Sequence, residues 1–382
     1  MTSKSTKPSD KADPPPANLI SGMAKQNYYG LILAGGRGTR FWPRSRKRTA
    51  KQVLNIGGGE ASLIQDTVAR LSPLIPPERI WILTNEFVRD EIVRQLPQVP
   101  AKQIIAEPAQ RNTAPAIGLA AHILASVDPK AIFGVFPSDH VIANSKRYLS
   151  LVRAAFRAAE QDKIAVLGVA PRWAETGYGY IEFPKGVEPG KLETVPVKRF
   201  REKPELKLAK KFVRAGNFYW NAGMFFWKAS TILDALRLHL PKTATMISSL
   251  PPFGHKEFAA RVAKVFPKCE NISIDYAVLQ KAGNVVGVAC DDFGWNDVGS
   301  WHAVYELLPR DADNNASRSE LLSKKSSGNY VDCGQKIVAL LGVNDLIVVD
   351  TPDAILVADR ARAQQVSDIV KLLEEQGRHH LL

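Results

Sequence analysis

LILAGGRGTR, at residues 31–40, joins an apolar run to a loop rich in glycine and arginine. The run Tyr29–Ala34 is suited to a strand covered on both faces. Three glycines among the next four residues let the backbone approach a ligand closely. Successive N–H groups in such a loop can face phosphate oxygens. The stretch therefore predicts a polyphosphate cradle directly after a buried strand.

The segment that follows this loop is strongly basic. From Arg37 to Lys51 it carries seven lysine and arginine residues and no acidic one. Such a concentration of positive charge suits three or four phosphate charges. A triphosphate is therefore the expected ligand.

Two common glycine-rich motifs do not fit the loop. A dinucleotide fingerprint, G-x-G-x-x-G, would need a third glycine where Phe41 stands, and no Walker loop, G-x-x-x-x-G-K-[ST], occurs in the sequence. An ordinary strand-to-helix turn with a solvated basic flank stays open as the alternative.

The composition is that of a globular protein. The 382 residues can form one large domain or a large domain with a small one, and 45% of them are hydrophobic. The net charge of +13 is spread along the chain without a nucleic-acid-binding signature, so no nucleic-acid partner is predicted.

The cysteines and the hydropathy of the sequence indicate the cellular compartment that it suits. Cys269, Cys290 and Cys333 form no C-x-x-C pair, which predicts neither a disulfide framework nor a zinc site and fits a reducing cytoplasm. No apolar run approaches membrane-spanning length, so no membrane contact is predicted. Residues 1–26 lack an apolar core of signal-peptide type and are predicted to be a disordered tail.

Helix and strand patterns alternate after this tail. That alternation predicts an α/β fold with a mostly parallel sheet flanked by helices over residues 27–308. Short strand patterns then predict a small β unit over residues 309–382, which could form one or two coils of a β-helix and ends in a helix at about 362–376. In parallel sheets, ligands collect at the carboxyl ends of the strands, where the glycine loop, residues 107–113 and residues 137–140 are expected.

Two aspartates are candidates for a metal site at this edge. Asp139 lies in PSDH (137–140) and Asp297 in GWNDVGSW (294–301). Magnesium is often held by one or two carboxylates, with phosphate oxygens and waters completing its shell, so two distant aspartates suffice. The alternative makes Asp139 a helix cap and Asp297 a turn residue.

A second group of residues suits a sugar phosphate. Glu202 can accept from vicinal hydroxyls while Lys203 neutralises a phosphate. The turn at residues 177–179 permits close backbone approach to a ring, and Asn221 can both donate and accept. A surface ion pair and a core aromatic cluster around Trp220 are the alternatives.

In combination, these segments resemble the sugar nucleotidyltransferases, and within them the mannose-1-phosphate guanylyltransferases. The resemblance spans nearly the whole chain. It is carried by LAGGRGTRFWP (33–43), EP (107–108) with RNTAP (111–115), PSDH (137–140), TGYGYI (176–181), EKP (202–204), WNAGMF (220–225), SIDYA (273–277) and WNDVGSW (295–301). One departure is Ala50, where the family has proline before the lysine, and it puts in doubt how rigidly Lys51 is presented.

The resemblance implies a Rossmann-like nucleotidyltransferase domain that transfers GMP from GTP to mannose 1-phosphate, giving GDP-mannose and pyrophosphate with Mg²⁺ as cofactor. It implies a homodimer that uses the C-terminal unit. Arg40, Lys51, Asp139 and Asp297 would be catalytic, with the two aspartates holding the metal. The nucleotide would be bound by Leu33, Ala34, Gly35, Gly36, Gly38, Thr39, Glu107, Arg111, Asn112 and Thr113, and the sugar phosphate by Tyr178, Gly179, Glu202, Lys203 and Asn221.

Two alternatives to this function stay open. Another hexose-1-phosphate nucleotidyltransferase would share the phosphate-binding residues and differ in base or sugar. A non-catalytic nucleotide-sugar sensor would bind without turnover, since the fold permits binding alone.

Overall fold

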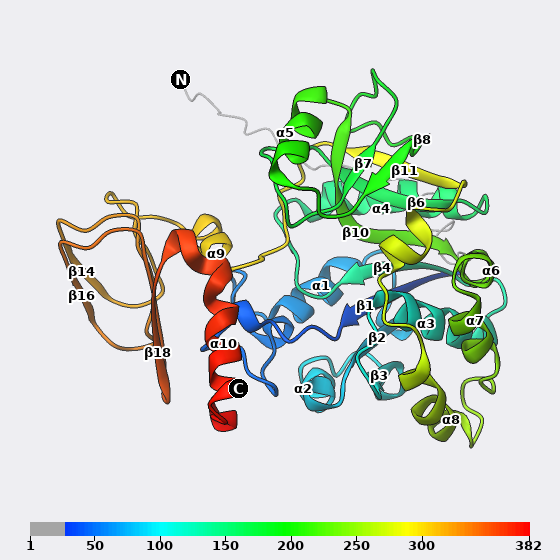
Figure 1. The fold of residues 1–382 in the computed structure, drawn as a ribbon, viewed down its shortest axis with the longest axis horizontal. Coiled ribbons are helices and arrows are strands. Elements are labelled where there is room, and N and C mark those ends of the chain that lie inside the picture. The colour runs from blue at the N-terminus through cyan, green and yellow to red at the C-terminus, as the bar shows by residue number, and fades with distance from the viewer. Residues whose placement is uncertain (1–26) are drawn as a thin grey trace, which may run out of the picture.

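A computed structural model of the chain describes residues 27–382, and the tail predicted for residues 1–26 lies outside them. Its main element is a ten-stranded sheet (Figure 1). Along the main path the strands follow the order β3 (Ile104–Glu107), β2 (Ile80–Asn85), β1 (Tyr28–Ala34), β4 (Ile132–Pro137), β10 (Phe218–Lys228), β6 (Ile164–Val169), β11 (Val285–Cys290) and β8 (Thr194–Pro196).

The sheet is mixed and mostly parallel, as predicted. β3, β2, β1 and β4 all run parallel, β10 runs antiparallel between β4 and β6, and β6 pairs in parallel with β11. Off this path, β7 (Tyr180–Glu182) pairs with both β10 and β9 (Arg199–Arg201). Because β1 to β4 point the same way, the loops that follow β1, β3 and β4 share one edge.

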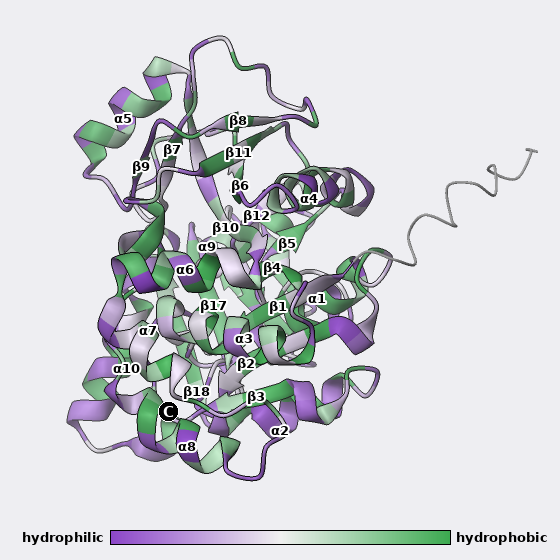
Figure 2. Cartoon of the chain, turned by 90° about the vertical axis from the view of Figure 1, so that its right-hand side faces the viewer, coloured by the Kyte–Doolittle hydropathy of each residue, from purple (hydrophilic) through white to green (hydrophobic). Residues whose placement is uncertain are grey.

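Helices cover both faces of the sheet, which explains why β1 is apolar throughout. Ile32 packs toward one face and Leu31 toward the other, and both are fully buried. Figure 2 shows hydrophobic residues along the central strands. The first face carries α1 (Leu63–Leu71), α2 (Glu86–Gln95), α4 (Ser145–Ala159) and α5 (Leu206–Ala215), and the second carries α3 (Thr113–Val127), α6 (Ala229–His239), α7 (Pro241–Ser248) and α8 (Phe258–Val265).

Local sequence signals set several helix starts. Ser62 and Gln65 form a capping box at the start of α1, with both reciprocal hydrogen bonds present. Asn85 caps α2 by accepting from the backbone N–H groups of Phe87 and Val88. Farther along the chain, Asp275–Leu279 is a single π-helical turn.

The C-terminal strands stack in parallel, as in a β-helix. β13 (Ala316–Ser317), β15 (Tyr330–Asp332) and β17 (Leu346–Thr351) form one ladder, and β14 (Leu321–Lys324) pairs with β16 (Val338–Leu341) in another. β18 (Ala354–Asp359) closes the first ladder antiparallel to β17. The Asn329 side chain donates to the Asn315 Oδ1 at 2.9 Å and accepts from the Leu346 N–H, which ties successive coils together. The terminal helix α10 is Val366–Glu375, shorter than expected because residues 360–365 form a 3₁₀ turn.

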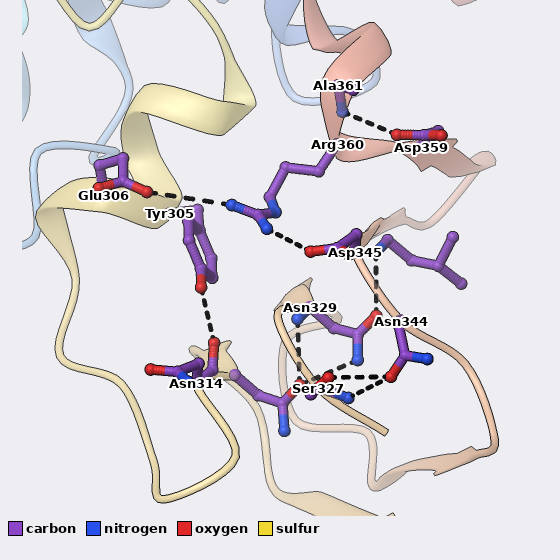
Figure 3. Close-up of polar contacts among 12 residues, drawn as sticks. Tyr305, Glu306, Asn314, Ser327, Asn329, Asn344, Asp345, Asp359, Arg360 and Ala361 are labelled. Carbon is purple, nitrogen blue, oxygen red and sulfur yellow. Dashed lines mark hydrogen bonds and ion pairs between the residues drawn. The ribbon is translucent and has the colours of Figure 1, made fainter. Parts of the chain in front are cut away.

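The C-terminal unit is packed onto the rest of the chain through a shared apolar cluster. That cluster joins Phe41, next to the glycine loop, with Trp301 of α9 (Trp301–Leu307), Tyr330 of β15 and Val370 of α10. Beside it the Arg360 guanidinium lies 4.1 Å from the Tyr305 ring centroid and pairs with acidic groups on both sides (Figure 3). The domain division predicted at residue 308 stays a prediction.

Candidate active site

The glycine loop after β1 is packed directly on Lys51. Gly38 has a φ of 64°, and a Cβ added there would lie 2.6 Å from the Lys51 Cβ. A Cβ on Gly35 would lie 3.1 Å from the Glu107 Oε2. Any larger residue at position 38 would therefore be strained and would displace the lysine.

Ala50 keeps the geometry that a proline would impose. Its φ is −66°, and it precedes the 3₁₀ turn Lys51–Val53. The Lys51 side chain is 7% exposed. Lys51 is thus held by the packing of the loop despite the departure from the family's proline.

A cavity of about 730 Å³ opens at the edge where the three predicted loops meet. Most of the residues predicted to bind the nucleotide line it. They are Leu33, Gly35, Gly36, Gly38, Thr39, Glu107, Arg111, Asn112 and Thr113, together with Lys51 and Asp139.

Three of the residues predicted to be catalytic or to bind the nucleotide are not part of this lining, namely Ala34, Arg40 and Asp297. Ala34 is buried, and its carbonyl oxygen accepts from the Gln52 amide at 2.6 Å and the Thr84 hydroxyl at 2.9 Å. Ala34 therefore fixes the start of the loop, and its backbone oxygen is already used. Arg40 lies to one side, beside Asp297, as described below.

The two predicted metal-binding aspartates converge on Lys51. The Lys51 Nζ donates to the Asp139 Oδ2 and to the backbone oxygen of Asp297, each at 2.8 Å. Both oxygens touch one nitrogen, so no more than twice that distance separates them.

A short antiparallel ladder explains this convergence. β5 (Val141–Ile142) follows Asp139, β12 (Trp295–Asn296) precedes Asp297, and the two strands pair Trp295 with Ile142. The Trp295 indole N–H also donates to the His140 Nδ1 at 3.1 Å. Two loops that are far apart in the sequence are thereby fixed side by side.

Electrostatics keep this centre anionic at Asp139 and neutral at His140. Burial opposes ionisation of Asp139, but the Lys51 ammonium and its hydrogen bond hold the pKa of this carboxyl below its usual value. Burial lowers the pKa of His140 to about 4, which agrees with its Nδ1 acting as an acceptor. The arrangement supplies carboxylate oxygens without a competing imidazolium charge.

Arg40 lies beside the second aspartate. A Cβ added to Gly299 would lie 2.9 Å from the Asp297 Oδ2 and 3.5 Å from the Arg40 Nη1. The absence of a side chain at Gly299 therefore leaves the guanidinium close to this carboxylate. The Arg40 Nη1 donates to the Gln364 Oε1 at 2.7 Å.

The predicted sugar-phosphate residues form a separate cluster. Gly179 is packed against the Glu202 carboxyl, where any Cβ would collide with Oε2. The Lys203 ammonium lies 3.8 Å from the Glu202 Oε1. The Asn221 amide donates to the Asp275 Oδ1 at 3.1 Å, so Asp275, to which the sequence assigned no role, belongs to the same cluster.

The Glu202 carboxyl is the chemically unusual group of this cluster. Its Oε2 is buried and has no hydrogen-bond partner among the described residues. Burial and the nearby Asp275 raise the pKa of Glu202 to about 7, against the opposing effect of Lys203. An unpaired buried oxygen of this kind is available to a ligand hydroxyl.

Tyr178 connects the two clusters. Its hydroxyl donates to the Asp297 Oδ1 at 2.6 Å, and its ring contacts Trp220 and Trp295 edge-on. The hydroxyl is therefore committed to the aspartate, while the backbone of the turn stays beside Glu202. Trp220 itself is fully buried, which agrees with the alternative interpretation that it belongs to a core aromatic cluster.

Part of the basic segment faces away from the cavity, which corrects the prediction that its charges serve phosphate as a group. Arg44 pairs with Asp332 and Arg46 with Asp353 at 2.9 Å, whereas Arg37 lines the cavity and also pairs with Glu374 at 2.7 Å. All three carboxylates belong to the C-terminal unit. Because these partners are nearly 300 residues or more away in the sequence, local charge counting cannot reveal them.

The donor set of the two aspartates fits a divalent metal only in combination with substrate oxygens. Within residues 27–382, no group of three or more histidine, cysteine, aspartate or glutamate residues could hold an ion. Asp139 lines the cavity, and Asp297 is joined to it through the contact of its backbone oxygen with Lys51. One or two carboxylates are the usual protein share of a magnesium site, since phosphates and waters provide the rest. The residues present therefore fit such an ion.

Sequence reasoning missed several polar residues that line the cavity. Asn271 reaches it because the Ala114 N–H donates to the Ile272 oxygen at 3.1 Å, which docks a distant loop onto the start of α3. No local pattern around residue 271 signals this contact. Gln52, Gln110 and Ser138 also line the cavity.

A glycine-rich loop and the Asp139 carboxylate at the carboxyl ends of parallel strands, with a buried lysine between them, define an α/β protein of the nucleotide-binding class. The nucleotidyl transferase family profile matches residues 29–314, and one described as the MannoseP isomerase/GMP-like beta-helix domain matches residues 322–373. The chain belongs to the nucleotidyl transferase family.

Individual relatives extend this likeness over most of the chain. The mannose-1-phosphate guanylyltransferase of Escherichia coli strain K12 is 36% identical over 368 residues, which cover 94% of this chain and 76% of the relative. Mannose-1-phosphate guanylyltransferase ManC of Salmonella typhimurium strain LT2 is also 36% identical, over 371 residues that cover 94% and 75%. A solved structure from Thermus thermophilus, described as a mannose-1-phosphate geranyltransferase, superposes with a TM-score of 0.80 at 30% identity, covering 91% of this chain and 100% of that chain.

Across residues 27–382, no helix is both long and apolar enough to cross a bilayer.

Proposed function

We propose that this protein transfers GMP from GTP to mannose 1-phosphate, producing GDP-mannose and pyrophosphate. The observation that carries the proposal is the shared contact of Lys51 with Asp139 and Asp297 beside the glycine loop. The family membership and the names of the relatives supply the substrates.

The nucleotide is assigned to the 730 Å³ cavity. Backbone N–H groups of the glycine loop would face the phosphates, and the base would lie toward Glu107 and residues 111–113. The Arg111 Nε supports this placement, because it is buried without a hydrogen-bond partner among the described residues and can donate to a ligand.

The sugar phosphate is assigned to the cluster around Glu202. Lys203 would neutralise its phosphate, and the free Glu202 oxygen would accept from a ring hydroxyl. Gly179 has no side chain, so the backbone of the turn can pack directly against the Glu202 carboxyl. Tyr178 then links this ligand to the nucleotide through its hydrogen bond to Asp297.

The chemistry requires no covalent enzyme intermediate. A phosphate oxygen of mannose 1-phosphate attacks the α-phosphorus of GTP, the bond to the β-phosphate oxygen breaks, and pyrophosphate leaves. Both reactants are anions, so Lys51 and Arg40 contribute by offsetting their repulsion and aligning them.

Nucleotidyltransferases of this family generally use a divalent metal. We assign magnesium to Asp139 and Asp297, where it would screen phosphate charge. Lys51 supports this role because it keeps the Asp139 carboxyl ionised.

A substrate panel tests the proposal. GTP, ATP, UTP and dTTP are each incubated with mannose 1-phosphate or glucose 1-phosphate, with and without Mg²⁺, and pyrophosphate release is measured. We expect the fastest release with GTP, mannose 1-phosphate and Mg²⁺. Faster release with another pair would indicate a different hexose-1-phosphate nucleotidyltransferase, and binding without release would indicate a sensor.

We also propose that the protein is a homodimer that uses the C-terminal unit. Leu322, Ile355 and Val357 are exposed apolar residues on the strands of that unit. Light scattering of the purified full chain should give twice the mass of 42.0 kDa, and a mass of one chain would contradict this part of the proposal.

A further inference from the structure

The C-terminal unit lies directly against the glycine loop. α10 packs on the 3₁₀ turn Thr39–Phe41, which includes Arg40, and the Trp42 indole donates to the Leu381 oxygen at 2.9 Å. In Figure 1 the red α10 runs beside the blue segment that follows β1. The loop assigned to the triphosphate is thus supported by residues from the end of the chain.

The two arginines of the loop make different contacts at this junction. Arg37 forms an ion pair with Glu374 at 2.7 Å, so a carboxylate offsets its charge. Arg40 donates to the neutral amide oxygen of Gln364 at 2.7 Å. The amide fixes the direction of the guanidinium and leaves its positive charge uncompensated at that contact.

The atom held by Gln364 is the Arg40 atom that lies beside Gly299 and Asp297. The Arg40 Nη1 lies 3.5 Å from the Cβ position of Gly299, which in turn lies 2.9 Å from the Asp297 Oδ2. Arg40 and Gln364 are both exposed, so packing alone does not restrict this long side chain. The hydrogen bond to Gln364 supplies the restriction that packing does not.

We propose that Gln364 is a positioning residue for Arg40, so that the C-terminal unit completes the phosphate-binding site of the catalytic domain. The inference rests on the proposed GMP transfer and deepens it. Gln364 holds the guanidinium beside Asp297 and the glycine loop with its full charge directed toward the triphosphate. The unit is therefore part of the active site and not only a support.

The identity of the side chain at position 364 matters for a physical reason. An amide acceptor orients a guanidinium without neutralising it, whereas a carboxylate would form an ion pair and weaken the positive field at the phosphates. Alanine would leave Arg40 free to sample other rotamers, and misplaced groups lose catalytic power steeply. Activity should therefore be highest with glutamine at position 364, lower with alanine and lowest with glutamate.

The experiment compares Gln364→Ala and Gln364→Glu with wild type, each alone and the alanine also combined with Arg40→Ala. Initial rates with GTP, mannose 1-phosphate and Mg²⁺ give kcat and KM, and thermal unfolding reports on folding. Asp353→Asn is the control, because Asp353 pairs with Arg46 at the same junction and does not line the cavity.

We expect Gln364→Ala to lower kcat/KM for GTP by about tenfold and Gln364→Glu to lower it further, both with the wild-type unfolding midpoint. In the Arg40→Ala background, Gln364→Ala should have no additional effect, because its action passes through Arg40. Asp353→Asn should behave as wild type.

Three results would overturn the inference. They are wild-type kinetics in both Gln364 variants, the same loss from Gln364→Ala with and without Arg40, or an equal loss in Asp353→Asn. Equilibrium titration with GTP alone gives a readout that needs no sugar substrate, and Gln364→Glu should bind GTP more weakly than wild type. An inactive wild type would therefore refute the proposed function, whereas an active wild type with silent Gln364 variants refutes only this inference.

Discussion

Lys51 combines several roles in one buried side chain. It bonds Asp139 and the backbone of Asp297, it lies beneath Gly38, and its ammonium lies 5.3 Å from the Phe41 ring centroid. A cation with these contacts sets the charge state of one aspartate and the distance to the other. Its removal should affect chemistry far more than the fold.

The first prediction concerns this side chain. Lys51→Ala should lower kcat by about two orders of magnitude or more, because a preorganised charge at the reacting phosphates is lost. The circular dichroism spectrum should stay that of wild type. Asp234→Asn, an exposed position on α6, is the matched control, and near-normal GDP-mannose synthesis by Lys51→Ala would contradict the assignment.

Glu107 gives a prediction about pH. Burial raises its pKa to about 8 from an ordinary value of 4.5, so the folded state binds the proton more tightly than the unfolded state. The stabilisation is complete below pH 4.5 and is lost as the pH rises through 8. Relative to Glu107→Gln, wild type should therefore lose on the order of 3 kcal/mol of unfolding free energy between pH 5 and pH 9.

Urea denaturation at these two pH values measures this difference. The glutamine variant is neutral at both, so subtracting its pH dependence removes the contribution of other groups. If the unfolding free energies of the two proteins change with pH in parallel, Glu107 is ionised in the folded state. Burial would then not raise its pKa, and the prediction would be wrong.

At the scale of elements, the site depends on a pair of two-residue strands. β5 and β12 are too short to be stable by their own ladder, and the indole bond from Trp295 to His140 reinforces them. This pairing brings Asp297 to Asp139. Its loss should disturb the site while the ten-stranded sheet stays intact.

Trp295→Phe tests this element. The variant loses one buried hydrogen bond, which should cost about 1 kcal/mol of unfolding free energy, and it should lower kcat severalfold because Asp297 is less well placed. Trp227→Phe is a close control: Trp227 is also fully buried, but its indole nitrogen has no partner among the described residues. Equal losses of activity in the two variants would contradict the positioning role of the pair.

Local signals in the sequence account for the elements but not for these contacts. The capping box at Ser62 and the apolar run before Gly35 predict α1 and β1 because their causes lie within a few residues. The ordered sequence motifs also predict most of the residues that line the cavity. By contrast, the partners of Arg44 and Arg46, the docking of the loop that carries Asn271 and the hydrogen bond from Tyr178 to Asp297 join distant segments, and no local pattern specifies them.

At the scale of the whole molecule, the basic segment is both a ligand site and a junction. Arg44 and Arg46 lie within ten residues of Gly36, yet both pair with the C-terminal unit. The Asp332 side chain is 7% exposed, whereas that of Asp353 is 47% exposed. These two ion pairs should therefore differ in energy.

Asp332→Asn should lower the free energy of unfolding by about 1–3 kcal/mol, because it leaves Arg44 beside a largely buried site without its counter-charge. Asp353→Asn should cost less than about 1 kcal/mol, since solvent screens that pair. Urea unfolding of both variants measures the difference. Equal effects would show that burial does not set the strength of this junction.

The central claim is that Asp139 and Asp297 act together at one metal-dependent phosphoryl site. It is tested most directly by the initial rate of GDP-mannose formation across a Mg²⁺ titration, in wild type and in Asp297→Asn. We predict that the wild-type rate depends on Mg²⁺ and that Asp297→Asn is about 100-fold slower at saturating metal. A variant with the wild-type rate and the same Mg²⁺ dependence would contradict the account.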